Sequence, residues 1–170
     1  VDAETWSKAE TEALGIHAGD FVSFDPRTVV TETGFVKSRH LDDKASSAVL
    51  LTLAREVAEG RAKLCRKTTL LFTVYEEVGH GASPLYHMDI EDMLAVDMGC
   101  VGDDLSCRET QVSICAKDSA GPYDYDFTNE LVQRAEHLKL DYTVDVYPRY
   151  SSDASTALRA GMDARFALCG

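Results

Sequence analysis

Two adjacent glutamates, Glu76 and Glu77, end an apolar run over 68–75, within the stretch FTVYEEVGHGAS. Neighbouring carboxylates repel each other, and moving either one out of water costs on the order of several kcal/mol unless a cation compensates. The pair therefore lies in open solvent or faces something positive. His80 follows shortly after and is either a metal ligand or an ordinary loop residue.

Acidic residues also stand at two other boundaries between sequence patterns. Asp42 and Asp43 precede a helical pattern, and Asp97 follows a short apolar run over 93–96. Functional residues of α/β sheets gather where strands end, so we expect the acidic side chains to converge. Carboxylate oxygens, together with imidazole, suit zinc, cobalt or manganese. The predicted cluster consists of Asp42, Glu76, Glu77 and Asp97.

Each acidic position has a simpler interpretation when it is taken alone. Asp42 and Asp43 could cap a helix and interact with its dipole. Glu76 and Glu77 could belong to an exposed loop, and Asp97 could form a turn. Their coincidence at three boundaries favours the metal site.

The elements that must position these residues follow an alternating pattern after Asp43. Apolar residues at helical spacing predict a helix over 43–60, which Gly60 would end. Further helices are expected over 126–140 and 151–161, and strands over 68–75, 93–98, 111–117, 142–148 and 164–170. The run over 68–75 is apolar on both faces, as in a covered sheet. The alternation predicts an α/β fold, a three-layer sandwich.

Residues 1–36 differ from the rest of the chain in their pattern of residue types. The sequence around Thr33 and Gly34 predicts two short strands, and the whole segment is expected to be all-β. We therefore expect one piece over 1–36 attached to an α/β part over 37–170.

The composition excludes several classes of function. The 170 residues are 45% hydrophobic and 27% charged, which is ordinary for a globular chain. A formal net charge of −12 argues against binding nucleic acid or an anionic membrane. The apolar runs are too short to span a bilayer, and no secretory signal opens the chain. Five cysteines without a CxxC pair predict reduced thiols, hence a cytoplasmic protein.

Four segments together resemble one known family. They are HLDDKASSAVLL, YEEVGHGAS, AVDMG and SSDAS, and they occur in the family's order at plausible spacing over nearly the whole chain. The sequence resembles the tetrahedral, or glutamyl, aminopeptidases, which are metallopeptidase family 42; some members were labelled endoglucanases. The resemblance implies a two-metal exopeptidase with a peptide substrate, two divalent ions (zinc or cobalt) and assembly into homo-oligomers.

The resemblance also assigns roles. Glu76 matches the general base, Asp42 the carboxylate that bridges both metals, and Glu77 and Asp97 the terminal ligands. Asp43 would follow Asp42 across an unusual peptide bond. Two further histidine ligands of the family have no counterpart, so we expect an internal fragment with an incomplete metal site and little or no activity of its own. The resemblance also implies that residues 1–36 are the remnant of an inserted, lid-like β-domain and 37–170 part of the catalytic domain.

Two other functions stay open at this stage. A glycosidase could use Glu76 and Asp97 across a sugar, although aromatic residues are only 8% of the chain. A non-catalytic fragment is the second alternative. A glutamyl preference would need a basic pocket, for which Arg39, Lys44 and Arg149 are candidates.

Overall fold

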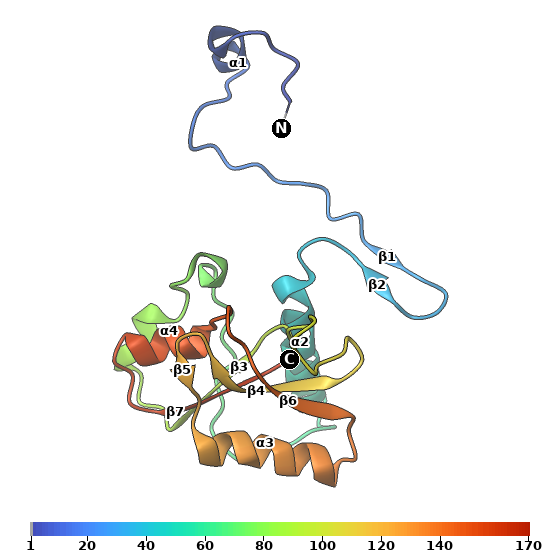
Figure 1. The fold of residues 1–170 in the computed structure, drawn as a ribbon, viewed down its shortest axis with the longest axis vertical. Coiled ribbons are helices and arrows are strands. Elements are labelled where there is room, and N and C mark those ends of the chain that lie inside the picture. Colours follow the sequence, from blue (N-terminus) through green and yellow to red (C-terminus); the bar gives the residue numbers. More distant parts are fainter. Residues whose placement is uncertain (1) are drawn as a thin grey trace. The chain divides into compact units, whose positions relative to one another are not determined.

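The structure, a computed structural model, describes residues 2–170 and divides into two compact units. They are Val1–Arg39 and His40–Gly170, and each is described by itself (Figure 1). In the described part of the chain, no helix is long and apolar enough to cross a membrane.

The first unit contains the predicted hairpin and one unexpected helix. Strands β1 (Val29–Val30) and β2 (Val36–Lys37) pair antiparallel around a turn in which Gly34 has a φ of 89°. The expectation that residues 1–36 are all-β is wrong, because helix α1 spans Lys8–Ala13. Ser7 caps it by accepting a hydrogen bond from the Glu10 amide, a local preference that overrides the β texture of the surrounding sequence.

The second unit is built on a mixed five-stranded sheet. Its strands run in the order β3–β7–β4–β5, and β6 also pairs with β4. The bounds are β3 Asp92–Val96, β4 Val112–Asp118, β5 Gly121–Pro122, β6 Tyr142–Val146 and β7 Arg165–Cys169. The β3–β7 and β4–β6 pairs are parallel, whereas β4 pairs antiparallel with both β7 and β5.

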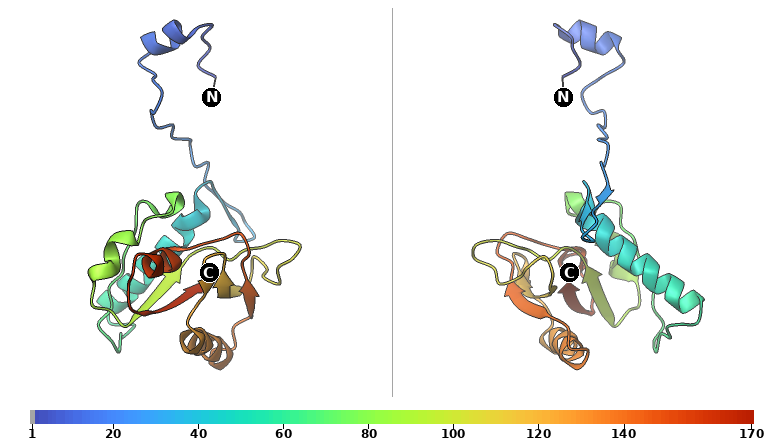
Figure 2. Two further views of the ribbon diagram at one scale, coloured as in Figure 1. Left: turned by 60° about the vertical axis from the view of Figure 1, so that its left-hand side comes forward. Right: turned by 90° about the vertical axis from the view of Figure 1, so that its right-hand side faces the viewer.

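Helices α3 (Tyr125–His137) and α4 (Asp153–Arg159) cover opposite faces of this sheet (Figure 2). Asp124 caps α3 by accepting from the Phe127 amide, and Ser152 with Ser155 forms a capping box at the start of α4. The helix–sheet–helix layering confirms the expected α/β sandwich. Helix α2 (Leu41–Ala58) confirms the helical pattern over 43–60.

The core lies between the sheet and α4. It joins small residues of α4 to the aromatic and aliphatic side chains of the strands. The buried residues are Ala82, Ala95, Cys115, Tyr123, Tyr147, Ala154, Ala157, Met162, Phe166 and Leu168. This packing fixes the first turn of α4 and the end of β3, which both border the site described below.

The strand expected over 68–75 is not formed. A strand requires a hydrogen-bonded neighbour, and no described strand pairs with this segment. Its apolar side chains remain accessible, with Leu71 44%, Phe72 44% and Val74 88% exposed. Instead, the chain continues into two short 3₁₀ helices, η1 (Glu76–Val78) and η2 (Ser83–His87).

An ion-pair network ties β3 to β7. Asp92 accepts from Arg165 Nε at 2.7 Å and Nη2 at 3.0 Å, and from Arg66 Nη1 at 2.6 Å. The hydrogen bonds from Arg165 hold the pKa of Asp92 below its usual range, against the effect of burial. A carboxyl whose pKa is lowered in the folded state contributes stability above its unfolded pKa and loses that contribution as the pH falls.

Asp92→Asn is therefore expected to lower the free energy of unfolding at pH 7 by about 1–3 kcal/mol, with a smaller difference at pH 3. Denaturant unfolding at both pH values measures this. Asp141→Asn is the control, because its pair with Arg108 is exposed and worth about 0–1 kcal/mol. Equal effects of the two substitutions at pH 7 would contradict this account of the network.

Candidate metal and catalytic site

The four acidic residues selected from the sequence line one pocket in the second unit. They are Asp42, Glu76, Glu77 and Asp97. The remaining lining residues are Gly79, Met98, Arg149, Tyr150 and Ser151, and the cavity volume is about 280 Å³. The predicted convergence of the acidic positions is thus present, although η1 rather than a strand end carries Glu76 and Glu77.

Asp97 reaches the pocket from the end of β3. The β3–β7 pairing continues one residue past β3, because the Asp97 amide donates to the Cys169 carbonyl at 3.0 Å. The Asp97 side chain accepts from the Met98 amide at 2.6 Å, and the residue is only 7% exposed. Asp97 is therefore a nearly buried carboxylate in a fixed position.

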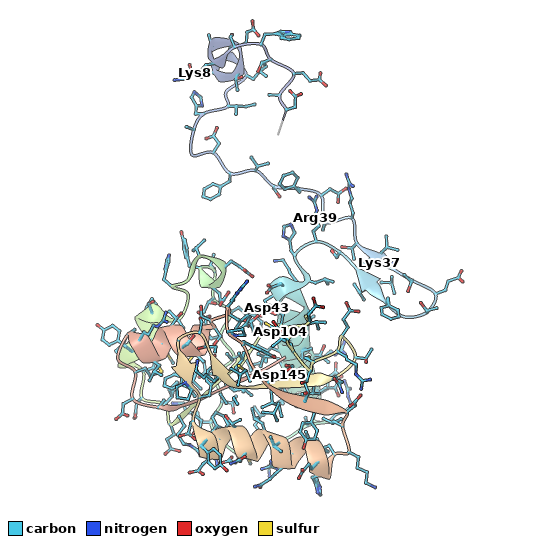
Figure 3. All side chains as sticks on the ribbon, viewed as in Figure 1. Lys8, Lys37, Arg39, Asp43, Asp104 and Asp145 are labelled. Atoms are coloured by element: carbon cyan, nitrogen blue, oxygen red, sulfur yellow. The ribbon has the colours of Figure 1, made fainter. Side chains whose placement is uncertain are left out.

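Asp42 and Asp43 enter from the start of α2, where Figure 3 labels Asp43. Their backbone is not helical, with φ and ψ of −87° and 107° at Asp42 and −118° and 43° at Asp43. The peptide bond between them is cis, which is the unusual bond that the family resemblance implied. Helical φ and ψ values begin only after Asp43, so this pair stands where a helix cap would, as in the simpler interpretation. Burial raises the pKa of Asp43, and hydrogen bonding with Ser46 lowers it by a smaller amount.

Three aspartates form the tightest part of the site. Asp42, Asp43 and Asp97 each offer one carboxylate oxygen, and these oxygens all lie within 4.8 Å of one another. The Oδ1 atom of Asp43 is buried and has no hydrogen-bond partner in the described structure. Hard oxygen donors gathered around an unpaired buried oxygen fit a divalent cation. Sequence reasoning gave Asp43 no ligand role, and only its adjacency to Asp42 signalled one.

The pKa values of four acidic side chains at the site are raised: those of Asp43, Glu76, Glu77 and Asp97. Burial, followed by the charges of Asp97 and Asp153, raises the pKa of Glu76 to about 7. Burial also raises the pKa of Asp43 to about 6, with Asp97 and Asp42 adding to it. The pKa values of Glu77 and Asp97 are raised by burial first and by neighbouring carboxylates second.

These shifts predict how metal-free protein responds to pH. Between the ordinary carboxyl pKa of about 4.5 and the folded value of about 7, Glu76 binds more protons in the folded than in the unfolded chain. The free energy of unfolding should therefore fall as the pH rises through this window. Adding cobalt should raise the melting temperature more at pH 7.5 than at pH 5, because the cation binds ionised carboxylates.

Thermal unfolding of chelator-treated protein at pH 5 and 7.5, with and without cobalt, measures both effects. Glu76→Gln should flatten the pH dependence of the metal-free protein. A melting temperature that rises from pH 5 to 7.5 equally in both proteins would contradict the assignment.

Tyr150 adds an unpaired hydroxyl to the pocket that sequence reasoning did not identify. Its hydroxyl is buried near the Asp97 carboxylate but has no hydrogen-bond partner of normal geometry among the described residues, and burial and then the charge of Asp97 raise its pKa. The ring packs edge-to-face on Tyr147 at a centroid distance of 5.3 Å. The main-chain carbonyl accepts from the amide and hydroxyl of Ser119. Tyr150 thus offers a well-fixed donor to any group that enters.

Of the histidine and basic residues considered from the sequence, only Arg149 lines the acidic pocket. The ring of His80 stacks on Tyr75 at 4.8 Å, and the carboxylate cluster found in residues 2–170 contains no histidine. Arg149 lines the pocket, whereas Lys44 does not. Arg39 belongs to the first unit, where its guanidinium donates to the Asp25 carbonyl.

Comparisons with known proteins identify relatives of the chain. A Bacillus subtilis (strain 168) protein named "Putative aminopeptidase YhfE" is 46% identical over all 170 residues, which span 49% of its length. The chain therefore spans about half the length of this curated relative.

Solved structures show the fold. Aminopeptidase APDkam598 from the archaeon Desulfurococcus kamchatkensis matches 98% of the chain with a TM-score of 0.77 at 24% identity. The Pyrococcus horikoshii TET1 peptidase matches 99% with a TM-score of 0.72 at 23% identity. The chain covers 49% and 50% of those two proteins, respectively. The family model for M42 glutamyl aminopeptidase matches residues 1–170, and the chain belongs to that family.

Proposed function

We propose that this protein is a metal-dependent aminopeptidase, a hydrolase that removes N-terminal residues from peptides. The observation that carries the proposal is the convergence of Asp42, Glu76, Glu77 and Asp97 in one pocket. Family membership supports it. A glycosidase needs only a pair of carboxylates, and would leave the Asp42–Asp43–Asp97 cluster without a role.

Asp42, Glu77 and Asp97 would hold two divalent ions, zinc or cobalt. Asp43 is a further candidate ligand, because one of its carboxylate oxygens lies within 4.8 Å of oxygens of Asp42 and Asp97. When bound, such ions would polarise the scissile carbonyl and lower the pKa of the attacking water. Burial first and neighbouring carboxylates second raise the pKa values of Asp43, Glu76 and Asp97. A bound cation would offset both effects, which suits the pocket to cations.

Glu76 would act as the general base. Its carboxylate accepts the proton of the attacking water and later delivers it to the leaving amine. In the metal-free protein, burial first and neighbouring carboxylates second raise the pKa of Glu76 to about 7. Bound cations would lower this pKa and so favour the ionised form that accepts the proton. Whereas Glu76 would accept a proton, Tyr150 would keep its own and donate a hydrogen bond from its neutral hydroxyl to the substrate.

Hydrolysis of aminoacyl chromogenic substrates tests the proposal. The panel compares leucyl with glutamyl substrates, each with a free and an acetylated amino group. An aminopeptidase cleaves only the free forms. Arg149 is among the residues that line the pocket, which supports a preference for the glutamyl substrate. Cleavage of acetylated substrates, or of a cellulose oligomer instead of any peptide substrate, would overturn the proposal.

The proposal extends to the domains, assembly and location of the protein. We infer that residues 1–36 belong to an inserted lid-like domain and 37–170 to the catalytic domain, since a compact unit ends at Arg39. Two structural neighbours assemble, one as a dodecamer and the other as a tetrahedron or a large octahedral shell, which supports a homo-oligomer. Five free cysteines suit a reducing, cytoplasmic location. Light scattering on purified protein measures the assembly.

A further inference from the structure

We propose that Asp153 is the positioning residue for Glu76, because it holds both ends of the segment 73–82 on the first turn of α4. This inference rests on the proposed function for the role of Glu76. The sequence marked SSDAS, residues 151–155, as one of four characteristic segments, but neither the metal cluster nor the general base uses its aspartate.

Two hydrogen bonds to a single carboxylate make the clamp. Asp153 Oδ2 accepts from the Thr73 hydroxyl at 2.5 Å, and Oδ1 accepts from the Ala82 amide at 2.8 Å. Thr73 lies three residues before Glu76, and Ala82 lies five residues after Glu77. The carboxylate therefore closes the chain into a loop whose tip carries both glutamates.

The packing inside this loop leaves no space for adjustment. A Cβ atom on Gly81 would lie 2.8 Å from Asp153 Oδ1, 2.8 Å from Thr73 Cβ and 2.9 Å from the main-chain nitrogen of Glu76. Side chains do not fit at such distances, so only glycine allows this close approach. The backbone of Glu76 is thus packed directly against the clamp.

The other side of the clamp is rigid. Asp153 follows Ser152, which is 1% exposed and forms a capping box with Ser155. The Ser152 hydroxyl is hydrogen-bonded to the Tyr123 hydroxyl at 2.7 Å, which in turn donates to the buried carboxylate of Asp118 at 2.8 Å. Asp153 thereby connects the segment of Glu76 to the best-packed part of the unit.

The segment needs such an attachment because no strand pairing holds it. Residues 68–75 form no described strand, and the side chain of Val74 is 88% exposed. Both oxygens of Asp153 are already used, and Asp153 neither lines the pocket nor belongs to the three-aspartate cluster. Asp153 therefore acts on the reaction through Glu76, by fixing its position in addition to the charge that it places nearby.

The test uses Asp153→Ala, Asp153→Asn and Thr73→Val in the full chain. Asparagine can keep both contacts, since its oxygen accepts from Ala82 and its amide donates to the Thr73 hydroxyl, whereas alanine loses both. We expect Asp153→Ala to lower kcat by about 10- to 100-fold with KM and metal content within about twofold of the wild type. Asp153→Asn should stay within about fivefold in kcat, and Thr73→Val should lie between.

Hydrogen exchange of a peptide covering 73–82 gives a readout that does not depend on activity. Exchange should be about tenfold faster or more in Asp153→Ala and Thr73→Val, and close to wild type in Asp153→Asn. If Asp153→Ala does not fold, Thr73→Val carries the test. Asp126→Ala, an exposed aspartate in the first turn of α3, is the matched control and should change neither readout.

Unchanged hydrogen exchange in both Asp153→Ala and Thr73→Val would overturn the proposal. An Asp153→Asn variant with as low a kcat as Asp153→Ala would also overturn it, because the charge of Asp153 would then matter rather than its hydrogen bonds. If the wild type lacks aminopeptidase activity while the exchange results hold, the proposed function fails and the clamp stands.

Discussion

Glu76→Gln is expected to retain its metal and to lose about a hundred- to ten-thousand-fold in turnover. The amide keeps the shape of the side chain but cannot accept the proton of the attacking water, and general-base catalysis is typically worth about that factor. Metal content, measured on the purified variant, should equal that of the wild type. The loss should therefore appear in kcat and should not respond to added metal.

The neighbouring substitution Glu77→Gln is the matched comparison, since it makes the same chemical change one residue along the same 3₁₀ helix. It should weaken the binding of one ion, because a neutral oxygen is a poorer ligand, and excess zinc or cobalt should restore part of its activity. If Glu76→Gln is the variant rescued by metal, the two roles are reversed. If neither variant changes turnover, the pair is a solvated loop.

Asp42→Asn is expected to lose both metal and activity. Asp42 belongs to the three-aspartate cluster and also raises the pKa of Glu77, so it borders both parts of the pocket. Replacing partners that only support a metal ligand costs roughly 10- to 100-fold in affinity or activity, and loss of a ligand itself should exceed this. Titration with cobalt, followed by turnover measurements, gives both numbers.

Asp104→Asn is the control for this substitution. Asp104 is exposed, does not line the pocket and is labelled in Figure 3. It should bind metal and turn over as the wild type does. An Asp42→Asn variant with wild-type metal affinity would show that Asp42 is not a ligand, and would leave the cis bond beside it as a feature of the backbone alone.

The position of acidic residues at element boundaries predicted that they converge, and Asp42, Glu76, Glu77 and Asp97 do line one pocket. Asp42 and Asp97 lie where α2 begins and β3 ends, and the boundary rule needs only the hydrophobic pattern to find such places. The hydrophobic pattern wrongly predicted a strand over 68–75, because an apolar run indicates burial but does not show whether a neighbouring strand is present to pair with it.

Other features depend on contacts between distant residues. The hydrogen bonds of Asp153 reach 80 and 71 positions back along the chain, to Thr73 and Ala82, and no local pattern reports them. Likewise, the unpaired oxygen of Asp43 and the unpaired hydroxyl of Tyr150 become visible only when the surrounding packing is known. Helix α1, by contrast, depends on a local contact: Ser7 caps it from the position just before its first residue, although the surrounding sequence favours strands.

The central claim is that the acidic pocket binds the metal ions on which peptide hydrolysis depends. The most direct measurement, made on the full-length protein, removes metal with a chelator and records cleavage of a free aminoacyl substrate. Zinc or cobalt is then restored while bound metal is counted. The account predicts that activity disappears with the metal, returns as the ions are restored, and saturates with about two ions per chain. Full activity in protein shown to be free of metal would contradict it.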